Sequence, residues 1–208
     1  MSKNVLHKNE GILAVKIARQ AIASALDNQD PFSDLPSTPV IFSEKRGAFV
    51  TLALNGELRG CVGYPYPALP LKEVLVKSAV AAAFEDPRFF PLEKKDLSKI
   101  TIEVRTLTLP ESLGSAFTTY SDQIQIGTHG LIVEYGEHRS AFLPQAAVEN
   151  GWNSVDFLCH ACKSAGLTPL MWKYGAKISR FERQVFREIE PNGMISDSEN
   201  EDKFEKTG

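Results

Sequence analysis

One short stretch of the sequence, "LRGCVG" from Leu58 to Gly63, combines an arginine, a thiol and two glycines within six residues. The stretch is typical of a β-strand, on which every second side chain points to the same face. Arg59 and Cys61 are then expected on one face, with Leu58 and Val62 on the opposite face, toward the core. A guanidinium beside a thiol favours the thiolate, which is the nucleophilic form of cysteine. The spacing is therefore compatible with a reactive thiol.

The two glycines and the thiol also have a purely structural explanation. Gly60 removes the side chain between the arginine and the thiol, so another backbone or a ligand can come close. Gly63 permits a backbone turn, and Tyr64 beyond it could stack on a flat substrate. Free cysteine is among the most buried residue types, and the arginine could pair with a carboxylate such as Glu57 or Glu103. The residues alone leave both explanations open.

A second thiol pattern, Cys159-x-x-Cys162, resembles redox and zinc motifs by its spacing. Asn153 is a suitable N-cap and Gly166 a suitable helix stop, so both cysteines are expected inside a helix. They lie more than a turn past the helix N-terminus that lowers the pKa of redox cysteines. A structural zinc needs four ligands, and no second pair is present. We interpret both as buried small hydrophobic residues and expect no metal and no cofactor.

Composition indicates a globular protein with a neutral body and an acidic tail. The chain has 208 residues, of which 43% are hydrophobic and 24% charged. Residues 191–208 carry five acidic and two basic side chains, net −3, which equals the net charge of the whole chain. Residues 1–190 therefore sum to zero, which argues against broad electrostatic attraction to nucleic acid. The polar tail, poor in apolar residues, is expected to be disordered.

No stretch of the sequence predicts secretion or a membrane anchor. The first residues contain no apolar segment typical of a signal peptide. The most apolar predicted helix, residues 71–84, is too short to span a bilayer and contains Lys77 and Ser78. We therefore expect a cytoplasmic protein without membrane contact.

The remaining sequence predicts the elements that position the motif. Residues 9–28 have the apolar periodicity of an amphipathic helix, and Asn55-Gly56 between alternating runs is a strong hairpin signal. In chain order we expect a helix at 9–28, strands within 39–64, a helix at 71–84, a strand at 98–108, a strand–hairpin–strand segment at 122–145, a helix after Asn153 and one long strand at 176–189.

The two halves of the chain share this order of elements, and an offset of 80 residues aligns them. Under this offset Gly60 corresponds to Ser140 and Cys61 to Ala141, so the hairpin itself does not require a thiol. This favours a role for Cys61 beyond packing. The pattern predicts an internal duplication of a hairpin–helix–strand unit; the identities that support it are Gly47 with Gly127, Gly56 with Gly136, Glu57 with Glu137 and Arg59 with Arg139.

"LRGCVG" is similar to the signature Leu-Arg-Gly-Cys-Ile-Gly of the AMMECR-type domain family, with Val62 in the place of the usual isoleucine. The resemblance continues through "AVAAAFEDPRFFPL", "ITIEVRTLT" and "IGTHGLIVEYGEHRSAFLPQ" and covers most of Lys8 to Phe186. It implies an α+β fold with an antiparallel sheet flanked by helices and two unequal subdomains around a cleft. The domain would occupy residues 1–190, and residues 191–208 would lie outside it.

The resemblance marks signature positions, among them Cys61, Glu103 and His129, and a functional interpretation of the residues draws these into one site. Cys61 would be the nucleophile and Arg59 the anion-holding group, with His129 or Glu103 as the acid–base group. Substrate-binding positions would be Gly60, Gly63, Tyr64, Asp86, Arg88 and Gln145.

Each of these positions has a structural alternative. Asp86-Pro87-Arg88 is a natural helix-ending turn in which Asp86 bonds nearby backbone. His129, next to Gly130, could be a turn histidine, and Gln145 could cap a short helix.

The family supplies no established reaction, so two functions stay open. The first is a thiol-dependent enzyme that acts on a small-molecule or nucleotide-like substrate, in a modification pathway with Memo-like and radical-SAM proteins. The second is a non-catalytic module that binds a protein or RNA through the cleft beside the motif. A metal site on Cys61 and His129 is the least supported, because the available ligands are scattered.

Overall fold

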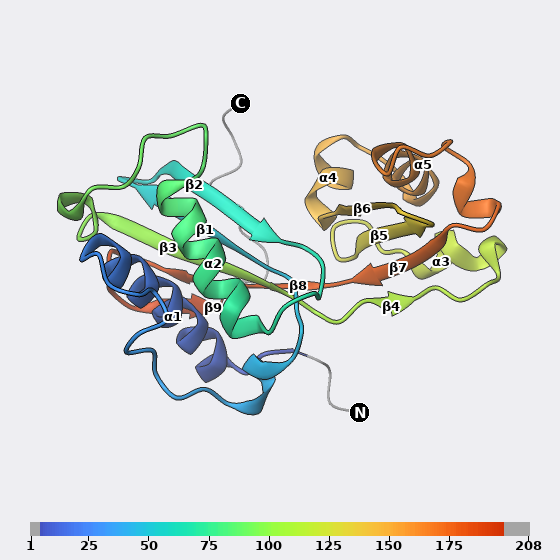
Figure 1. The fold of residues 1–208 in the computed structure, drawn as a ribbon. Coiled ribbons are helices and arrows are strands. Elements are labelled where there is room, and N and C mark those ends of the chain that lie inside the picture. Colours follow the sequence, from blue (N-terminus) through green and yellow to red (C-terminus); the bar gives the residue numbers. More distant parts are fainter. Residues whose placement is uncertain (1–4, 198–208) are drawn as a thin grey trace. The chain divides into compact units, whose positions relative to one another are not determined.

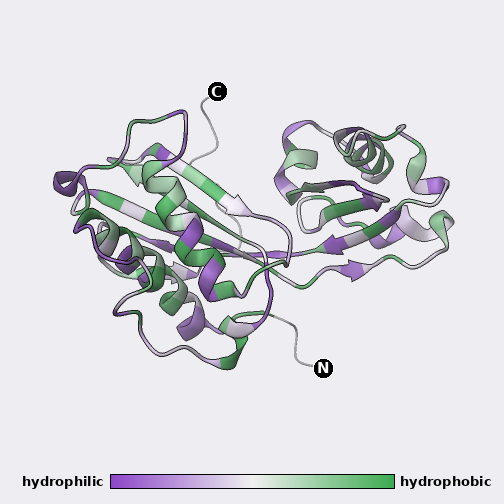
Figure 2. Cartoon of the chain, in the orientation of Figure 1, coloured by the Kyte–Doolittle hydropathy of each residue, from purple (hydrophilic) through white to green (hydrophobic). Residues whose placement is uncertain are grey.

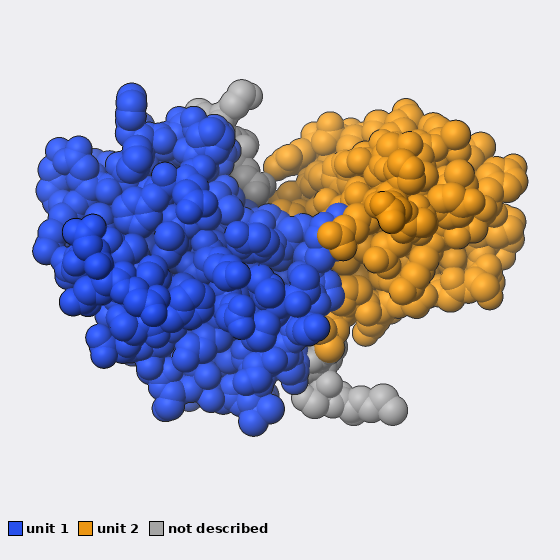
Figure 3. Space-filling view, in the orientation of Figure 1, with its two compact units in different colours: residues 1–107, 184–208 blue, residues 108–183 orange. Residues whose placement is uncertain are grey.

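The computed structural model describes residues 5–197, which contain five α-helices and nine strands in two compact units. Unit 1 comprises residues 1–107 and 184–208, and unit 2 comprises residues 108–183 (Figure 3). Each unit has its own sheet, and the strand pairings within each sheet are antiparallel (Figure 1). The predicted α+β class with antiparallel sheets is therefore confirmed.

Unit 1 is built on a five-stranded sheet in the order β2-β1-β3-β8-β9. The helices α1 and α2 pack against each other and against one face of this sheet (Figure 1). The elements of unit 1 are α1 (Lys8–Leu26), the 3₁₀ helix η1 (Val40–Ser43), β1 (Ala48–Leu54), β2 (Glu57–Tyr64), α2 (Leu71–Phe84), η2 (Lys94–Asp96), β3 (Ile100–Leu107), β8 (Arg183–Glu188, which begins at the boundary with unit 2) and β9 (Ile195–Asp197).

The sequence alternation explains why one face of the sheet meets the helices. Val50 and Leu52 on β1 and Ile102 on β3 are fully buried and join one core with α1 and α2. Figure 2 shows hydrophobic residues along both helices and these strands. Because alternate residues of a strand point to opposite faces, the intervening positions lie on the other face of the sheet.

That other face carries polar side chains, and we call Thr51, Cys61, Glu103, Arg105 and Arg187 together the polar face. Thr51 lies opposite both Cys61 on β2 and Glu103 on β3 in the strand register. All five except Cys61 are buried, and Cys61 is partly exposed. Charged side chains are rarely buried unless they are paired. The buried Glu103, Arg105 and Arg187 therefore make this face unusual within unit 1.

Unit 2 has a four-stranded sheet in the order β4-β7-β5-β6, with α5 packed against β5 and β6. Asn153 caps α5 as predicted, because its side-chain oxygen accepts from the backbone N–H groups of Val155 and Asp156. Gly166 follows the helix with φ of 76°. The elements are β4 (Glu111–Ser112), η3 (Phe117–Thr119), α3 (Tyr120–Gln123), β5 (Gly130–Tyr135), β6 (His138–Phe142), α4 (Pro144–Glu149), α5 (Ser154–Ser164), η4 (Met171–Lys173) and β7 (Lys177–Phe181).

The two sheets share a topological unit, as the 80-residue correspondence implies. In unit 1 a hairpin, a helix and a return strand give the order β2-β1-β3, and in unit 2 the same sequence of elements gives β6-β5-β7. Positions that correspond under the 80-residue offset also contact corresponding helices. A Cβ at Gly60 would lie 2.0 Å from the carbonyl oxygen of Ala82 on α2, and the hydroxyl of Ser140 donates to the carbonyl of Ala161 on α5.

Three segments differ from the sequence predictions. Val40–Ser43 forms a 3₁₀ helix, so the strand begins only at Ala48. The long strand expected at 176–189 is extended but breaks at Glu182 into β7 and β8, which pair in different sheets. The prediction of a disordered tail from Pro191 is wrong for Ile195–Asp197, which pairs with β8 as β9.

The remainder of that predicted tail, residues 198–208, lies outside the described residues. Within the part that the structure describes, no helix has the length and apolarity to cross a membrane.

Candidate functional site

The motif lies on β2, an edge strand that contains a β-bulge. Leu52 pairs with Gly60, but the next residue of β1, Ala53, pairs with Leu58, so Arg59 has no partner on β1. Such a bulge adds one residue to a strand and shifts the register beyond it by one. Because of this shift, Cys61 and not Gly60 lies opposite Thr51.

The bulge changes which side chains share a face, and the expected alternation across the motif is wrong. Leu58 pairs with Ala53, which lies on the same face as Thr51, whereas Val62 packs against the core on the helix side. Leu58 and Val62 therefore do not share the core-facing side. Cys61 pairs with Thr51 and so lies on the polar face.

Cys61 is held by polar groups on both its side chain and its backbone. The hydroxyl of Thr51 donates a hydrogen bond to Sγ over 3.2 Å, and the Cys61 backbone N–H donates to the carboxylate of Asp86 over 2.8 Å. Cys61 as a whole residue is partly exposed. A fixed sulfur on a partly exposed residue meets two requirements of a nucleophile.

Asp86 is a buried carboxylate that fastens the turn after α2 to the edge of β2. Besides the Cys61 backbone, it accepts from the backbone and the guanidinium of Arg88, the shortest of these bonds being 2.7 Å. Hydrogen bonds from the Arg88 side chain hold the pKa of Asp86 well below its ordinary value, so it is ionised. The predicted helix-ending turn, with Asp86 bonded to nearby backbone, is confirmed.

Two arginines complete this edge. Arg59, the bulge residue, donates to the carbonyl oxygen of Pro91 over 3.2 Å, and Arg88 approaches the carbonyl oxygen of Cys61 at 3.4 Å. The segment 86–91 therefore runs beside the free edge of β2, where an unpaired strand would otherwise expose its N–H and C=O groups. Arg88 keeps a half-exposed side chain that can meet an anion.

The two glycines of the motif serve packing. A Cβ at Gly60 would lie 2.0 Å from the Ala82 carbonyl oxygen, and a Cβ at Gly63 would lie 2.3 Å from the ring of Phe49. Both distances are far below van der Waals contact, so neither position accepts a side chain without displacement of its neighbour. Gly60 admits a helix backbone, which is one of the two roles expected of it. Tyr64, at the end of β2, is 39% exposed.

Glu103 lies on the polar face but its carboxylate contacts arginines. Its oxygens are 2.8 Å from Nε of Arg105 and 3.8 Å from Nε of Arg187. Since β1 separates β3 from β2, Glu103 and Cys61 stand two strand spacings apart, or about 10 Å between their backbones. Glu103 therefore neutralises buried guanidinium groups, and Thr51 is the polar group that reaches the thiol.

The other two predicted site residues belong to unit 2. Nδ1 of His129 accepts from the backbone N–H of Gln125 over 3.0 Å, so the lone pair that a general base needs is already used. Burial lowers the pKa of His129, which keeps the ring neutral. These contacts match the turn histidine that the sequence allowed. Gln145 is buried in the first turn of α4, whose N-cap is Leu143 without a side-chain bond, so Gln145 does not cap the helix.

The three cysteines differ sharply in environment. Cys162 is fully buried, and burial raises the pKa of its thiol to about 11. Cys159 lies on the same helix and packs against the core of unit 2 but is partly exposed, as Cys61 is, so the prediction of two buried cysteines is wrong for Cys159. Cys61 alone lies on a strand with a hydroxyl bonded to its sulfur. Among residues 5–197, no three His, Cys, Asp or Glu side chains group closely enough to hold a metal ion.

Thr51 is the site residue that sequence reasoning missed. Counting outward from the Asn55-Gly56 turn without a bulge would place Val50, not Thr51, opposite Cys61. A glycine inside a strand is a known sign of a bulge, and Gly60 was therefore the available signal.

The fold and site define a class of protein: an α+β protein of two antiparallel sheets with a partly exposed cysteine on a bulged edge strand. The AMMECR1 family model matches residues 15–186, and the chain belongs to this family. A protein of Methanosarcina acetivorans is 43% identical over 197 residues, covering 92% of this chain and 98% of its own. Protein MJ0810 of Methanocaldococcus jannaschii is 44% identical over 195 residues, covering 92% and 96%.

A solved structure shares the fold. The crystal structure of the uncharacterized protein PH0010 from Pyrococcus horikoshii superimposes with a TM-score of 0.77 and 35% sequence identity, covering 94% of this chain and 99% of that one. The resemblance that the motif indicated is thus confirmed at the level of family and fold.

Proposed function

We propose that the protein is a thiol-dependent group-transfer or hydrolytic enzyme, with Cys61 as its nucleophile. The observation that carries the proposal is the hydrogen bond from Thr51 to the sulfur of a partly exposed cysteine. A hydroxyl that donates to sulfur matches the thiolate, which accepts hydrogen bonds and attacks electrophiles. Neither Cys159 nor Cys162 has a comparable set of contacts.

The chemistry that this arrangement supports is attack on an electrophilic acyl carbon of a small or nucleotide-like substrate. The sulfur forms a bond to the acyl carbon, the bond to the leaving group breaks, and the thiol proton passes through solvent to the leaving group. Water or a second acceptor then attacks the thioester and releases Cys61. Asp86 does not act as the base, because its oxygens already accept from Cys61 and Arg88.

Positive charge beside the thiol suits an anionic substrate. Arg88 is half exposed and reaches the Cys61 carbonyl, and Arg59 borders the same edge of β2. Both would hold an anionic group of the substrate near the sulfur. Because Nδ1 of His129 already accepts from the backbone N–H of Gln125, acid–base chemistry by His129 is not part of the proposal. Substrate binding by Gln145 is proposed from the family resemblance, and substrate binding by Tyr64 is proposed from its aromatic ring.

The test is covalent trapping at Cys61. The full chain is incubated with small activated thioesters, and the intact mass and the labelled peptide are measured for the wild type, Cys61→Ser and Cys159→Ser. We expect a hydroxylamine-labile acyl adduct on Cys61 in the wild type and in Cys159→Ser, and none in Cys61→Ser. Equal labelling of the wild type and Cys61→Ser would refute the proposal.

The rival function is a non-catalytic protein- or RNA-binding module at the same edge. Phe90, in the segment beside β2, is 89% exposed, which favours a binding surface next to Arg88. This rival expects Cys61→Ser to retain function and Arg59→Ala to lose it, whereas the enzyme expects Cys61→Ser to be inactive. Because Arg59 also braces the edge through Pro91, the folding of Arg59→Ala is checked by circular dichroism.

Two further parts of the proposal concern its cellular setting. The family resemblance supports the proposal that the protein acts together with Memo-like and radical-SAM proteins in a modification pathway. A cytoplasmic location is supported by three cysteines that are all free thiols, since reducing compartments keep thiols unpaired. Co-purification of the tagged protein with tagged Memo-like and radical-SAM proteins tests the first, and fluorescence microscopy of the tagged chain tests the second.

A further inference from the structure

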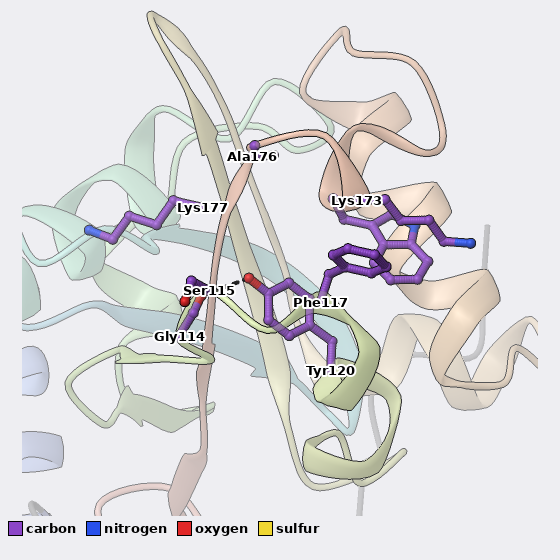
Figure 4. A pocket seen from close by; sticks show the side chains of 9 residues that line it. Gly114, Ser115, Phe117, Tyr120, Lys173, Ala176 and Lys177 are labelled. Atoms are coloured by element: carbon purple, nitrogen blue, oxygen red, sulfur yellow. Dashed lines mark hydrogen bonds between the residues drawn. The ribbon is translucent and has the colours of Figure 1, made fainter.

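Each unit has a place that two basic side chains border. In unit 2 this place is a cavity of about 270 Å³, lined in part by Lys173 and Lys177. Figure 4 shows that the ammonium groups of these two lysines point away from the cavity in opposite directions. The two lysines therefore do not direct positive charge to one point, whereas two arginines on the polar face of unit 1 do.

On the polar face, two guanidinium groups converge on one carboxylate. Nε of Arg105 lies 2.8 Å from one oxygen of Glu103, and Nε of Arg187 lies 3.8 Å from the other. The arginine side chains are only 3% and 10% exposed. Two positive charges and one negative charge give these three residues a net charge of +1. Burial of a net charge is unfavourable unless opposite charge balances it, so this face suits an acidic segment of chain.

The two long helices of unit 1 lie on the other side of the sheet. α1 and α2 pack against the face that carries Val50, Leu52 and Ile102 (Figure 1). Alternate residues of a strand point to opposite faces, so neither helix accounts for the burial of Arg105 and Arg187. That burial requires chain on the polar face itself.

The C-terminal segment, residues 198–208, starts beside the polar face. It follows β9 directly, and in the register of the β8–β9 pair Ser196 lies opposite Arg187. Neighbouring strands are about 4.8 Å apart, so β8, β3 and β2 lie about 5, 10 and 19 Å from β9 in the order of the sheet. Eleven extended residues span at most about 36 Å. The segment is therefore long enough to cross the face from β9 to Cys61 on β2.

The charges of this segment follow the order of the strands that it would cross. Glu199, Glu201 and Asp202 come before the first basic residue, Lys203. At about 3.3 Å per extended residue, the three carboxylates would lie about 7–17 Å from the end of β9. This range includes β3 and begins just past β8, the two strands that carry the arginines. The residues from Lys203 onward would lie nearer β2.

We propose that residues 198–208 dock on the polar face, with their carboxylates toward Arg187 and Arg105 and their last residues over Cys61. The segment is polar, so charge rather than apolar burial would hold it, and salt would weaken the docking. The docked segment would occupy the side of the sheet from which an anionic substrate approaches the sulfur. The proposal does not require Cys61 to be catalytic, so the covalent-trapping test of the proposed function succeeds or fails independently.

The test changes the charge of the segment within the full chain. A neutral-tail variant combines Glu199→Gln, Glu201→Gln and Asp202→Asn, which keep the length and nearly the shape of each side chain. The control variant combines Lys203→Gln and Lys206→Gln, which make the same segment more acidic. All five positions lie outside the sheet, and circular dichroism checks that both variants fold as the wild type does.

Two measurements report on the polar face. The amide chemical shifts of Thr51 and Arg105 are recorded by NMR, because these residues lie on β1 and β3, away from the substituted positions. The rate of Cys61 alkylation by iodoacetamide is measured with Cys159 in unit 2 as the internal reference. Both are measured in about 0.05 M and about 1 M sodium chloride, since exposed charges are screened at the higher concentration.

At low salt we expect both amide shifts to differ between the wild type and the neutral-tail variant. Cys61 should be alkylated roughly threefold to fivefold faster in that variant, as expected for the loss of several partly exposed ion pairs. At high salt the wild type should approach the variant in both measurements, and the control variant should react no faster than the wild type at either concentration. Unchanged shifts of the Thr51 and Arg105 amides at low salt, or an unchanged Cys61 rate, would overturn the proposal.

Discussion

Replacement of Asp86 tests the role of this carboxylate in holding β2. Asp86→Ala removes the acceptor of the Cys61 backbone N–H and of three bonds from Arg88. The matched control is Asp27→Ala, since Asp27 pairs with Lys94 at a position where both side chains are largely exposed.

The magnitude follows from the burial of each partner. An unsatisfied buried backbone N–H costs about 1–3 kcal/mol. The Arg88 side chain is 55% exposed, so its ion pair with Asp86 adds only about 1 kcal/mol. We expect Asp86→Ala to reduce the free energy of unfolding of unit 1 by about 3 kcal/mol, and Asp27→Ala by less than about 1 kcal/mol.

Amide hydrogen exchange, resolved by residue, measures the effect where it arises. Because 1.4 kcal/mol corresponds to a factor of ten, the Cys61 amide should exchange roughly a hundredfold faster in Asp86→Ala than in the wild type. The amides of α5 in unit 2 should be unchanged. A Cys61 amide that stays as protected as in the wild type would refute the role assigned to Asp86.

Acid titration of a second Asp86 variant, the packing of Gly60 and the burial of Cys162 give three further predictions. The pKa of Asp86 is lower in the folded state than in the unfolded state, so its contribution to the free energy of unfolding is present above about pH 4 and is lost as the pH falls further. Unfolding curves should therefore show a shallower loss of stability below about pH 4 for Asp86→Asn than for the wild type. Parallel curves for the two proteins would contradict this. Gly60→Ala places a Cβ 2.0 Å from the Ala82 carbonyl oxygen and should cost about 2–3 kcal/mol in urea unfolding, as overpacking does, while Cys61→Ala on the same strand should cost clearly less; equal losses would remove the packing explanation for the glycine. With a pKa of about 11, Cys162 should resist alkylation at pH 8 unless the protein is unfolded. Prompt labelling of Cys162 in the native protein at pH 8 would contradict the burial of this thiol.

Much of the fold follows from local sequence signals. The helix at 71–84 and the Asn153 cap occur as predicted, because apolar periodicity and capping chemistry act within a few residues. The break of the long strand at Glu182 could not be predicted from the sequence, because residues on both sides of it favour an extended backbone. Only pairing with distant strands assigns β7 to one sheet and β8 to the other.

The candidate site shows the same division between local and distant effects. The sequence identified Cys61, Arg59 and Asp86, and the turn chemistry of Asp86 was correctly predicted. It did not identify Thr51, because the bulge at Arg59 moves the cross-strand partner of Cys61 by one residue. A one-residue shift exchanges the two faces of a strand, and the close contact of Gly60 with α2 that accompanies it involves residues 22 positions apart.

The most direct test of a nucleophilic Cys61 is the alkylation rate of each cysteine in the native protein at pH 7. Iodoacetamide labelling followed by peptide mass spectrometry gives the three rates separately, with Thr51→Val as the variant that removes the hydroxyl from the sulfur. We expect Cys61 to react fastest, Cys159 more slowly and Cys162 hardly at all, and we expect Thr51→Val to slow Cys61 alone. A Cys61 that reacts no faster than Cys159 would contradict the thiol chemistry proposed for this protein.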